Sequence, residues 1–362
     1  MLENQRLHIL IKRYLRRTKV KKLLNTLYVT STNRYLSLDG ENVVILEDQE
    51  EIGRVPLHNL EGIVTFGYTG ASPALMGACA ERNIDLSFMS GNGRFLARVS
   101  GEVRGNVTFR KEQYRISEQK KESIKIARNF ITGKVYNAKW VLERAARDYP
   151  LRLDVDRIKE KSAFMSGNLP KIRECEDAER LLGIEGVSAS LYFSVFDELI
   201  LQQKDEFSFE GRNKRPPLDN VNAMLSFAYT LLTGMCASAL ESVGLDPYVG
   251  FYHTDRPGRV SLALDLMEEL RSVMADRFVL TLINKKIIGA SGFSKKESGA
   301  VIMDDDTRRQ FLSHWQDKKK ETITHPFLAE KMEWGLVPYV QAMLLARYIR
   351  GDLDEYPPFL WK

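Results

Sequence analysis

Glu185 is the first of four side chains whose type and position could carry chemistry. It stands in the segment 183–186, GIEG, between two predicted helices. Glycines on both sides let a backbone turn sharply and approach a ligand closely. The helix expected from residue 187 would place the carboxylate near a helix N-terminus. A solvated helix cap is the alternative, and for this segment alone it is the more frequent arrangement.

The other three side chains follow each other closely in the sequence. His253 lies in the segment 251–259, a loop containing proline and glycine that leads into a predicted helix over 261–284. Functional residues gather in such loops, although a lone histidine more often only bonds to loop backbone. Asp265 and Glu268 are three residues apart and share a helix face. Asp265 is flanked by leucines, so we expect it to be partly buried beside a partner such as a cation. An ordinary polar stripe is the alternative for both.

One histidine and three carboxylates together make a hard, oxygen-rich ligand set. Such a set suits Mg²⁺ or Mn²⁺ rather than structural zinc. These ions polarise a phosphate, activate an attacking hydroxyl or water, and stabilise the departing oxygen. A P-loop, a nucleophile elbow, a His-Glu-x-x-His motif and a cysteine pair at zinc spacing are all absent from the sequence. Phosphoryl-group chemistry is therefore the predicted reaction class.

Basic residues near these segments suit a phosphate-bearing substrate. Arg212, Lys214 and Arg215 stand in a loop ahead of a predicted helix, and Arg256 and Arg259 stand in the loop of the histidine. Guanidinium groups pair bidentately with phosphate oxygens. We expect these five side chains to contact substrate phosphate; a solvated charged loop is the alternative.

The 362-residue chain has the composition of a folded globular protein, with 44% hydrophobic and 28% charged residues. This excludes a fibrous protein, a largely disordered protein and a small disulfide scaffold, and the length suggests about two domains. Three widely separated cysteines predict free thiols in a reducing cytoplasm. The sequence has no apolar run of about 18 residues and no apolar leader. We therefore expect a cytoplasmic protein with no membrane partner.

The net charge of +5 is concentrated in residues 1–19, which contain six Lys or Arg and one Glu. The remaining residues sum to zero, so a polyanion would have to bind a local basic surface rather than the bulk charge.

Strand-like and helix-like patterns are segregated along the chain. Short β-prone runs fill residues 27–99, and helical periods dominate after about residue 115. This order predicts an α+β fold. It divides into a basic extension over 1–19, a small N-terminal β domain over 20–105 and a larger all-α-helical catalytic domain over 106–362. The expected helices are 117–148, 154–166, 171–182, 187–204, 218–240, 261–284, 304–321 and 333–350.

Four motifs in order resemble those of the CRISPR-associated integrases known as the Cas-one family. They are 183–186 (GIEG), 213–223 (NKRPPLDNVNA), 253–258 (HTDRPG) and 264–269 (LDLMEE). The resemblance runs from about residue 20 to the end of the chain. The segments 22–29 (KLLNTLYV) and 354–362 (DEYPPFLWK) are similar to the type I-C branch.

The resemblance implies a metal-dependent DNA endonuclease and integrase of CRISPR adaptation. Such an enzyme inserts new spacers into the repeat array by transesterification, with Mg²⁺ or Mn²⁺ as cofactor. The implied partners are double-stranded DNA (prespacer and CRISPR repeat), a second copy in a homodimer, a Cas-two dimer and a Cas-four nuclease.

The resemblance also implies a ligand set made of a glutamate, a histidine and a helix acid. By motif these are Glu185, His253 and either Glu268 or Asp265. The two helix acids rank equally, and Asp265 could instead act through another ligand. Residues 1–19 lie outside the family pattern. One interpretation is a start-site error, with Val20 encoded by a GTG start codon; a functional basic arm is the alternative.

Two other functions remain open from the sequence. A stand-alone metal-dependent nuclease acting on branched or damaged DNA would use the same residues with water as nucleophile. A non-enzymatic DNA-binding scaffold would carry the acidic residues as a surface stripe.

Overall fold

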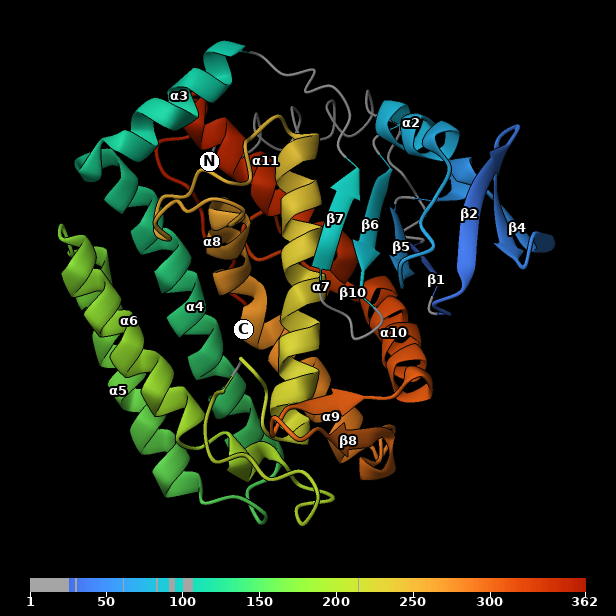
Figure 1. Ribbon diagram of the computed structural model, residues 1–362. Coiled ribbons are helices and arrows are strands. Elements are labelled where there is room, and N and C mark those ends of the chain that lie inside the picture. Colours follow the sequence, from blue (N-terminus) through green and yellow to red (C-terminus); the bar gives the residue numbers. More distant parts are fainter. Residues whose placement is uncertain are drawn as a thin grey trace.

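The computed structural model describes residues 26–29, 31–60, 62–82, 84–90, 95–99, 107–213 and 215–362. The predictions for residues 1–19, for Lys214 and for a domain boundary at 105/106 lie outside the described residues. A strand-rich N-terminal part stands beside a larger helical part (Figure 1). The predicted α+β class is confirmed.

The N-terminal part contains two sheets and one helix. One sheet has the order β1-β5-β6-β7, with β7 antiparallel to its neighbour, and the other is the antiparallel meander β2-β3-β4. Fully buried aliphatic residues such as Leu36, Ile63, Leu75 and Leu86 form their common core. The elements are β1 (Thr26–Val29), β2 (Arg34–Asp39), β3 (Asn42–Glu47), β4 (Glu50–Pro56), β5 (Gly62–Phe66), α2 (Pro73–Arg82), β6 (Asp85–Met89) and β7 (Phe95–Val99).

Helices dominate the rest of the chain, as predicted, but it is not entirely helical. Two short hairpins, β8–β9 and β10–β11, interrupt the helices. Strands of three residues are too short to produce a readable period in the sequence. The elements are α3 (Val107–Glu118), α4 (Lys120–Asp148), α5 (Val155–Arg173), α6 (Ala178–Phe193), α7 (Asn220–Ser242), α8 (Ser261–Leu270), α9 (Arg277–Asn284), β8 (Phe293–Lys295), β9 (Val301–Met303), α10 (Asp305–Lys320), β10 (Thr322–Thr324), β11 (Lys331–Glu333) and α11 (Val337–Ile349).

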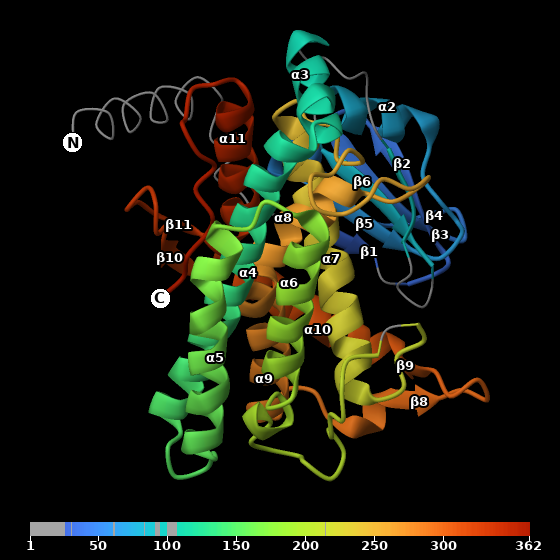
Figure 2. The ribbon, with the colours of Figure 1, turned by 90° about the vertical axis from the view of Figure 1, so that its left-hand side faces the viewer.

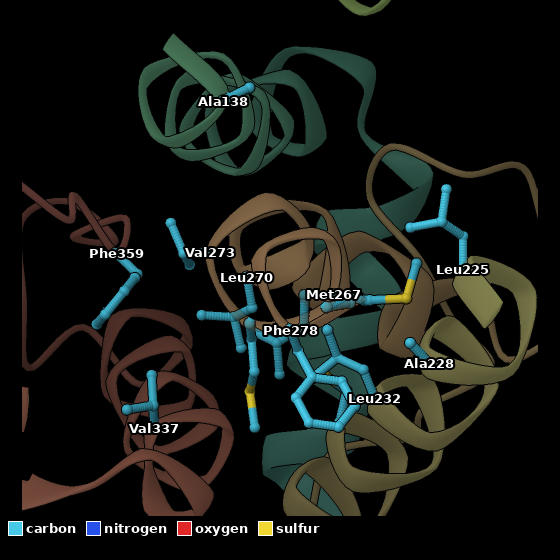
Figure 3. Close-up of a cluster of buried hydrophobic side chains, with 14 of the residues drawn as sticks. Ala138, Leu225, Ala228, Leu232, Met267, Leu270, Val273, Phe278, Val337 and Phe359 are labelled. Carbon is cyan, nitrogen blue, oxygen red and sulfur yellow. The ribbon is translucent and has the colours of Figure 1, made fainter. Parts of the chain in front are cut away.

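Helix α8 lies at the centre of the helical part, packed against α4 and α7 (Figure 2). Apolar side chains of α7 and α8 belong to one buried cluster with Phe359 of the C-terminal segment, and α7 and Phe359 lie on opposite sides of α8 (Figure 3). At Gly133 of α4 an added Cβ would lie 2.7 Å from the Cβ of Glu269. Only glycine permits so close an approach, which brings the middle of α4 against α8.

The predicted helix over 261–284 is confirmed as one continuous helical run. Its middle, Arg271–Asp276, is a π-helical segment between α8 and α9. Such segments are rare and often found at functional sites.

The C-terminal segment fastens α4 to α8. The side chain of Asn137 donates to the carbonyls of Glu269 and Phe359 and accepts from the Trp361 amide. The buried Glu269 carboxylate accepts from Tyr356 Oη, from the Phe359 amide and from Gln341 Nε2. These bonds fix the relative position of two helices that carry candidate site residues.

Helix α7 is long and apolar enough to cross a membrane by length and composition alone. Within the protein it lies between the sheet and the other helices (Figure 1), and 61% of its most apolar window is buried. This is the pattern of a core helix.

Candidate active site

Glu185 lies within helix α6, not between two helices. The predicted break at 183–186 is wrong: Asp177 caps the helix by accepting from the Arg180 amide, and α6 continues to Phe193. The predicted helix over 187–204 is therefore only the end of α6. Two glycines cost a helix about 1 kcal/mol each, but packing of Leu181, Ser188 and Tyr192 outweighs that cost.

Lys134 of α4 joins Glu185 to Glu268. Its Nζ lies 2.5 Å from Glu185 Oε1 and 2.6 Å from Glu268 Oε2. The two carboxylate oxygens are thus no farther apart than the sum of these distances. All three side chains are at least 86% buried, with exposed fractions of 14%, 13% and 8%. Helices α4, α6 and α8 therefore converge on one buried cation clamped by two carboxylates.

The pKa of Glu268 is set by opposing effects. Burial alone would raise the pKa, but the charges of Lys134 and Arg271 outweigh burial and lower it to about 2. Glu268 therefore remains anionic throughout the pH range in which the protein would be assayed. The ring of His253 lies beside the same helix, because its Nδ1 is 2.7 Å from Oδ1 of Asp265, which stands three residues before Glu268 on α8.

Asp265 is fully buried and holds the loop of His253. Its Oδ2 accepts from the amides of Phe251 and Tyr252 at 2.7 and 2.9 Å. Its Oδ1 accepts from the His253 amide at 2.9 Å and lies 2.7 Å from His253 Nδ1. An ionised carboxylate can only accept, so Nδ1 carries the proton and Nε2 keeps a free lone pair. The predicted partner of Asp265 was a cation; its main partners are backbone amides.

Gly250 makes this loop geometry possible. A Cβ at that position would lie 2.7 Å from the His253 carbonyl oxygen, 2.8 Å from Ser261 Cβ and 3.1 Å from Asp265 Oδ2. The loop can therefore fold tightly onto the start of α8 only with glycine there.

Tyr252 extends the contact between this loop and α6. Its hydroxyl donates to Glu185 Oε2 at 3.3 Å, and burial together with the nearby carboxylates raises the pKa of the phenol. The phenol remains neutral and can orient the Glu185 carboxylate.

The donor types at the site, rather than a preformed geometry, fit a hard divalent cation. The described residues contain no preformed group of three acidic, histidine or cysteine side chains arranged around one ion position. Instead, the Lys134 ammonium stands between Glu185 and Glu268 as a cation already bound by both. Carboxylate oxygens with one imidazole nitrogen are the donors expected for Mg²⁺ or Mn²⁺.

The basic residues divide into internal and external groups. The Arg212 guanidinium donates to Asn222 Oδ1 at 2.6 Å and to Ser226 Oγ at 3.0 Å, and it lies over the Tyr229 ring. Both terminal nitrogens of Arg212 therefore bond inside the protein, which favours a structural role over the predicted phosphate contact. Arg215 and Arg256 are exposed and Arg259 is half-buried.

Arg212→Ala should therefore destabilise the protein rather than weaken its electrostatic contact with DNA. Losing these hydrogen bonds should lower the free energy of unfolding by about 1–3 kcal/mol. Urea unfolding measures the loss. An unchanged unfolding midpoint, or a reduced salt dependence of DNA binding, would contradict this structural role.

Lys134 and Tyr252 are the site residues that the sequence alone did not reveal. Lys134 directly follows a largely apolar stretch of its helix, 130–133 (FITG). A single cation beside apolar residues was the only sequence feature that could have indicated a buried lysine. Its two partners lie on other helices, so no short motif links them.

Comparison with known proteins identifies the family. Residues 27–317 match the family described as CRISPR associated protein Cas1. The chain belongs to the Cas1 family. It is 50% identical over 343 residues to CRISPR-associated endonuclease Cas1 1 of Chlorobaculum tepidum, covering 95% of this chain and 100% of that one. It is 51% identical over 347 residues to CRISPR-associated endonuclease Cas1 2 of Rhodospirillum rubrum, covering 95% of this chain and 100% of that one.

Cas1 sequences also occur within larger proteins and complexes. A Cas4/Cas1 fusion of Geobacter sulfurreducens is 34% identical over 340 residues, which is 92% of this chain and 60% of the fusion. A casposase bound to integration product superposes with a TM-score of 0.80 at 23% identity, covering 94% of this chain and 95% of that one. A Cas6-RT-Cas1–Cas2 complex superposes with a TM-score of 0.77 at 20% identity, covering 94% of this chain and 36% of that one. The structural likenesses confirm the fold.

Proposed function

We propose that this Cas1 protein is a metal-dependent DNA endonuclease and integrase that inserts new spacers into a CRISPR array. The observation that carries the proposal is the pair of buried carboxylates, Glu185 and Glu268, clamping a cation beside the loop of His253, whose neighbour Tyr252 bonds to Glu185. Family membership supports the endonuclease activity. The casposase with its integration product supports the strand-transfer reaction.

Glu185, His253 and Glu268 would hold Mg²⁺ or Mn²⁺. A bound ion would supply a Lewis acid that polarises the phosphate and stabilises the departing oxygen. Asp265 has no free lone pair directed to the site because loop amides and His253 use both oxygens. We therefore place Glu268 in the ligand set and give Asp265 the role of positioning His253.

The chain's own groups prepare the site for strand transfer. Asp265 fixes the His253 ring with Nε2 available, and Tyr252 orients Glu185. In the reaction a prespacer 3′-oxygen forms a bond to phosphorus at the repeat boundary, and the bond from phosphorus to the repeat's own oxygen breaks. Arg271, 3.5 Å from Glu268 Oε2, holds that carboxylate ionised.

The proposed partners follow from the relatives and the resemblance. Cas4/Cas1 fusions support association with a Cas4 nuclease, and the Cas1–Cas2 complex supports association with a Cas2 dimer. We further propose a homodimer, a type I-C assignment, a cytoplasmic location and the division into domains at about residue 105. Arg215, Arg256, Arg259 and Lys214 are the proposed contacts to prespacer or repeat DNA.

A strand-joining assay separates integrase from stand-alone nuclease. The purified protein, with Cas2 where needed, is incubated with a 3′-hydroxyl donor, a repeat-bearing target and Mn²⁺. Covalent donor–target products support the integrase, whereas cleavage without joining supports the nuclease. Binding that is indifferent to metal, with neither product, supports a DNA-binding scaffold.

Arg215→Ala should weaken binding to all DNA sequences alike. Phosphate contacts position a protein without reading sequence, and each lost contact flattens the slope of log affinity against log salt by about one. Fluorescence anisotropy with two unrelated duplexes at several salt concentrations measures both effects. Arg212→Ala is the matched control, because it removes the same charge type from the same loop but should leave the slope unchanged. Equal slopes for wild type and Arg215→Ala would refute the contact.

A further inference from the structure

We propose that Lys134 is the resident counter-ion of the metal-free site and must be displaced when a divalent ion binds. The inference rests on the proposed metal site. Its geometric basis is the position of Lys134 Nζ, 2.5 Å from Glu185 and 2.6 Å from Glu268. An ion bound to the same two oxygens at about 2.1 Å would lie too close to the ammonium nitrogen for both to remain.

The local charge balance supports replacement of Lys134 by the divalent ion rather than binding of both cations at once. Lys134 bridges Glu185 and Glu268, Arg271 interacts with both Glu268 and the buried Asp276, and these side chains are mostly shielded from water. Adding a divalent ion with the lysine in place would set three positive charges against the two carboxylates that Lys134 now bridges. Repulsion between cations a few ångströms apart is strong where solvent screening is weak. Displacement of Lys134 removes this conflict.

The surroundings give the displaced side chain room to move. A small pocket lies against Lys134 and is also lined by Ser188, Tyr192, Arg271 and Asp276. The flexible lysine stem can therefore relocate without movement of α4, which Gly133 and Asn137 hold against α8 and the C-terminal segment.

Removing the Lys134 ammonium should therefore lower the stability of the metal-free protein and raise its affinity for the metal ion. Without lysine, Glu185 keeps only the Tyr252 hydroxyl as a partner and Glu268 keeps only Arg271, so the metal-free protein should melt at a lower temperature. The same protein loses the competitor for the ion, so its Mn²⁺ affinity should rise by at least about tenfold. A purely structural lysine would lower the melting temperature without raising metal affinity.

The test compares Lys134→Met with wild type and Lys125→Met. Lys125 lies on the same helix in an exposed pair with Glu122, so its replacement removes an equal charge away from the site. Melting temperature is measured with and without Mn²⁺, and Mn²⁺ affinity is measured by electron paramagnetic resonance of the free ion. Lys134→Met should melt lower without metal, gain more from Mn²⁺ and bind it more tightly, while Lys125→Met matches wild type. Lys134→Gln, which retains an N–H donor for the carboxylates, gives the same comparison if the methionine variant does not fold.

Unchanged or weaker Mn²⁺ affinity in Lys134→Met or Lys134→Gln would overturn the inference. Glu185→Gln separates this failure from failure of the metal site itself. If wild type responds to Mn²⁺ and Glu185→Gln does not, the metal site stands and only the role of Lys134 falls. If neither protein responds to Mn²⁺, the proposed metal site fails as well.

Discussion

Glu185→Gln should abolish Mn²⁺-dependent strand joining, with a loss of at least about a hundredfold. Loss of a residue that only hydrogen-bonds to a metal ligand lowers metal affinity or activity by about 10- to 100-fold. Glu185 is proposed to contact the ion directly, so its loss should cost more. Glutamine keeps the shape, its oxygen can accept from Lys134, and its NH₂ group can donate to the Tyr252 hydroxyl oxygen, so the helix should remain folded. Joining rates are measured at saturating donor and target over a range of Mn²⁺ concentrations, with melting temperature as the folding control.

His253→Ala should produce a loss of similar size by a separate route. It removes the imidazole but leaves both carboxylates and Lys134 in place. Glu179→Gln is the matched control for Glu185→Gln, because Glu179 is an exposed acid in the first turn of the same helix. Joining rates within about threefold of wild type for Glu185→Gln would remove it from the ligand set; a control that loses as much activity would locate the effect in α6 as a whole.

The sequence was most informative where local rules and tertiary packing agree. The helix over 261–284 carries a consistent apolar face, and the sheet-then-helix order is visible in the periodicities. At 183–186 the local rule failed: two glycines predicted a break, and packing of α6 against α4 and α5 overrode it. Propensity is a weak guide once an element is held by tertiary contacts.

The site could be predicted only in part because its central contacts are long-range. Glu185, His253, Asp265 and Glu268 were all selected from the sequence. Lys134 was not, because it is 51 residues from Glu185 and meets it only through the packing of two helices. The different roles of the two acids on α8 are also visible only in the structure. Glu268 contacts Lys134, whereas Asp265 accepts hydrogen bonds from the amides of a loop 12 to 14 residues earlier.

Asp265→Asn should lower both the stability of the protein and its affinity for Mn²⁺. The asparagine NH₂ group would face amide donors that the carboxylate now accepts, leaving buried N–H groups unpaired at about 1–3 kcal/mol each. The ring of His253 would also lose the acceptor that fixes its orientation, and such changes cost about 10- to 100-fold in metal affinity. Urea unfolding and Mn²⁺ binding are measured on the same preparations.

Asp255→Asn is the control, because Asp255 is an exposed acid of the same loop that accepts one bond, from the Gly250 amide at 3.0 Å. It should change stability by no more than about 1 kcal/mol and leave Mn²⁺ binding intact. Because Asp265 acts through His253, excess Mn²⁺ should restore part of the joining activity of Asp265→Asn but not that of Glu185→Gln. Lower stability with undiminished Mn²⁺ affinity would confine Asp265 to holding the loop. Activity that no Mn²⁺ concentration restores, in a protein that remains folded, would instead place Asp265 among the ligands.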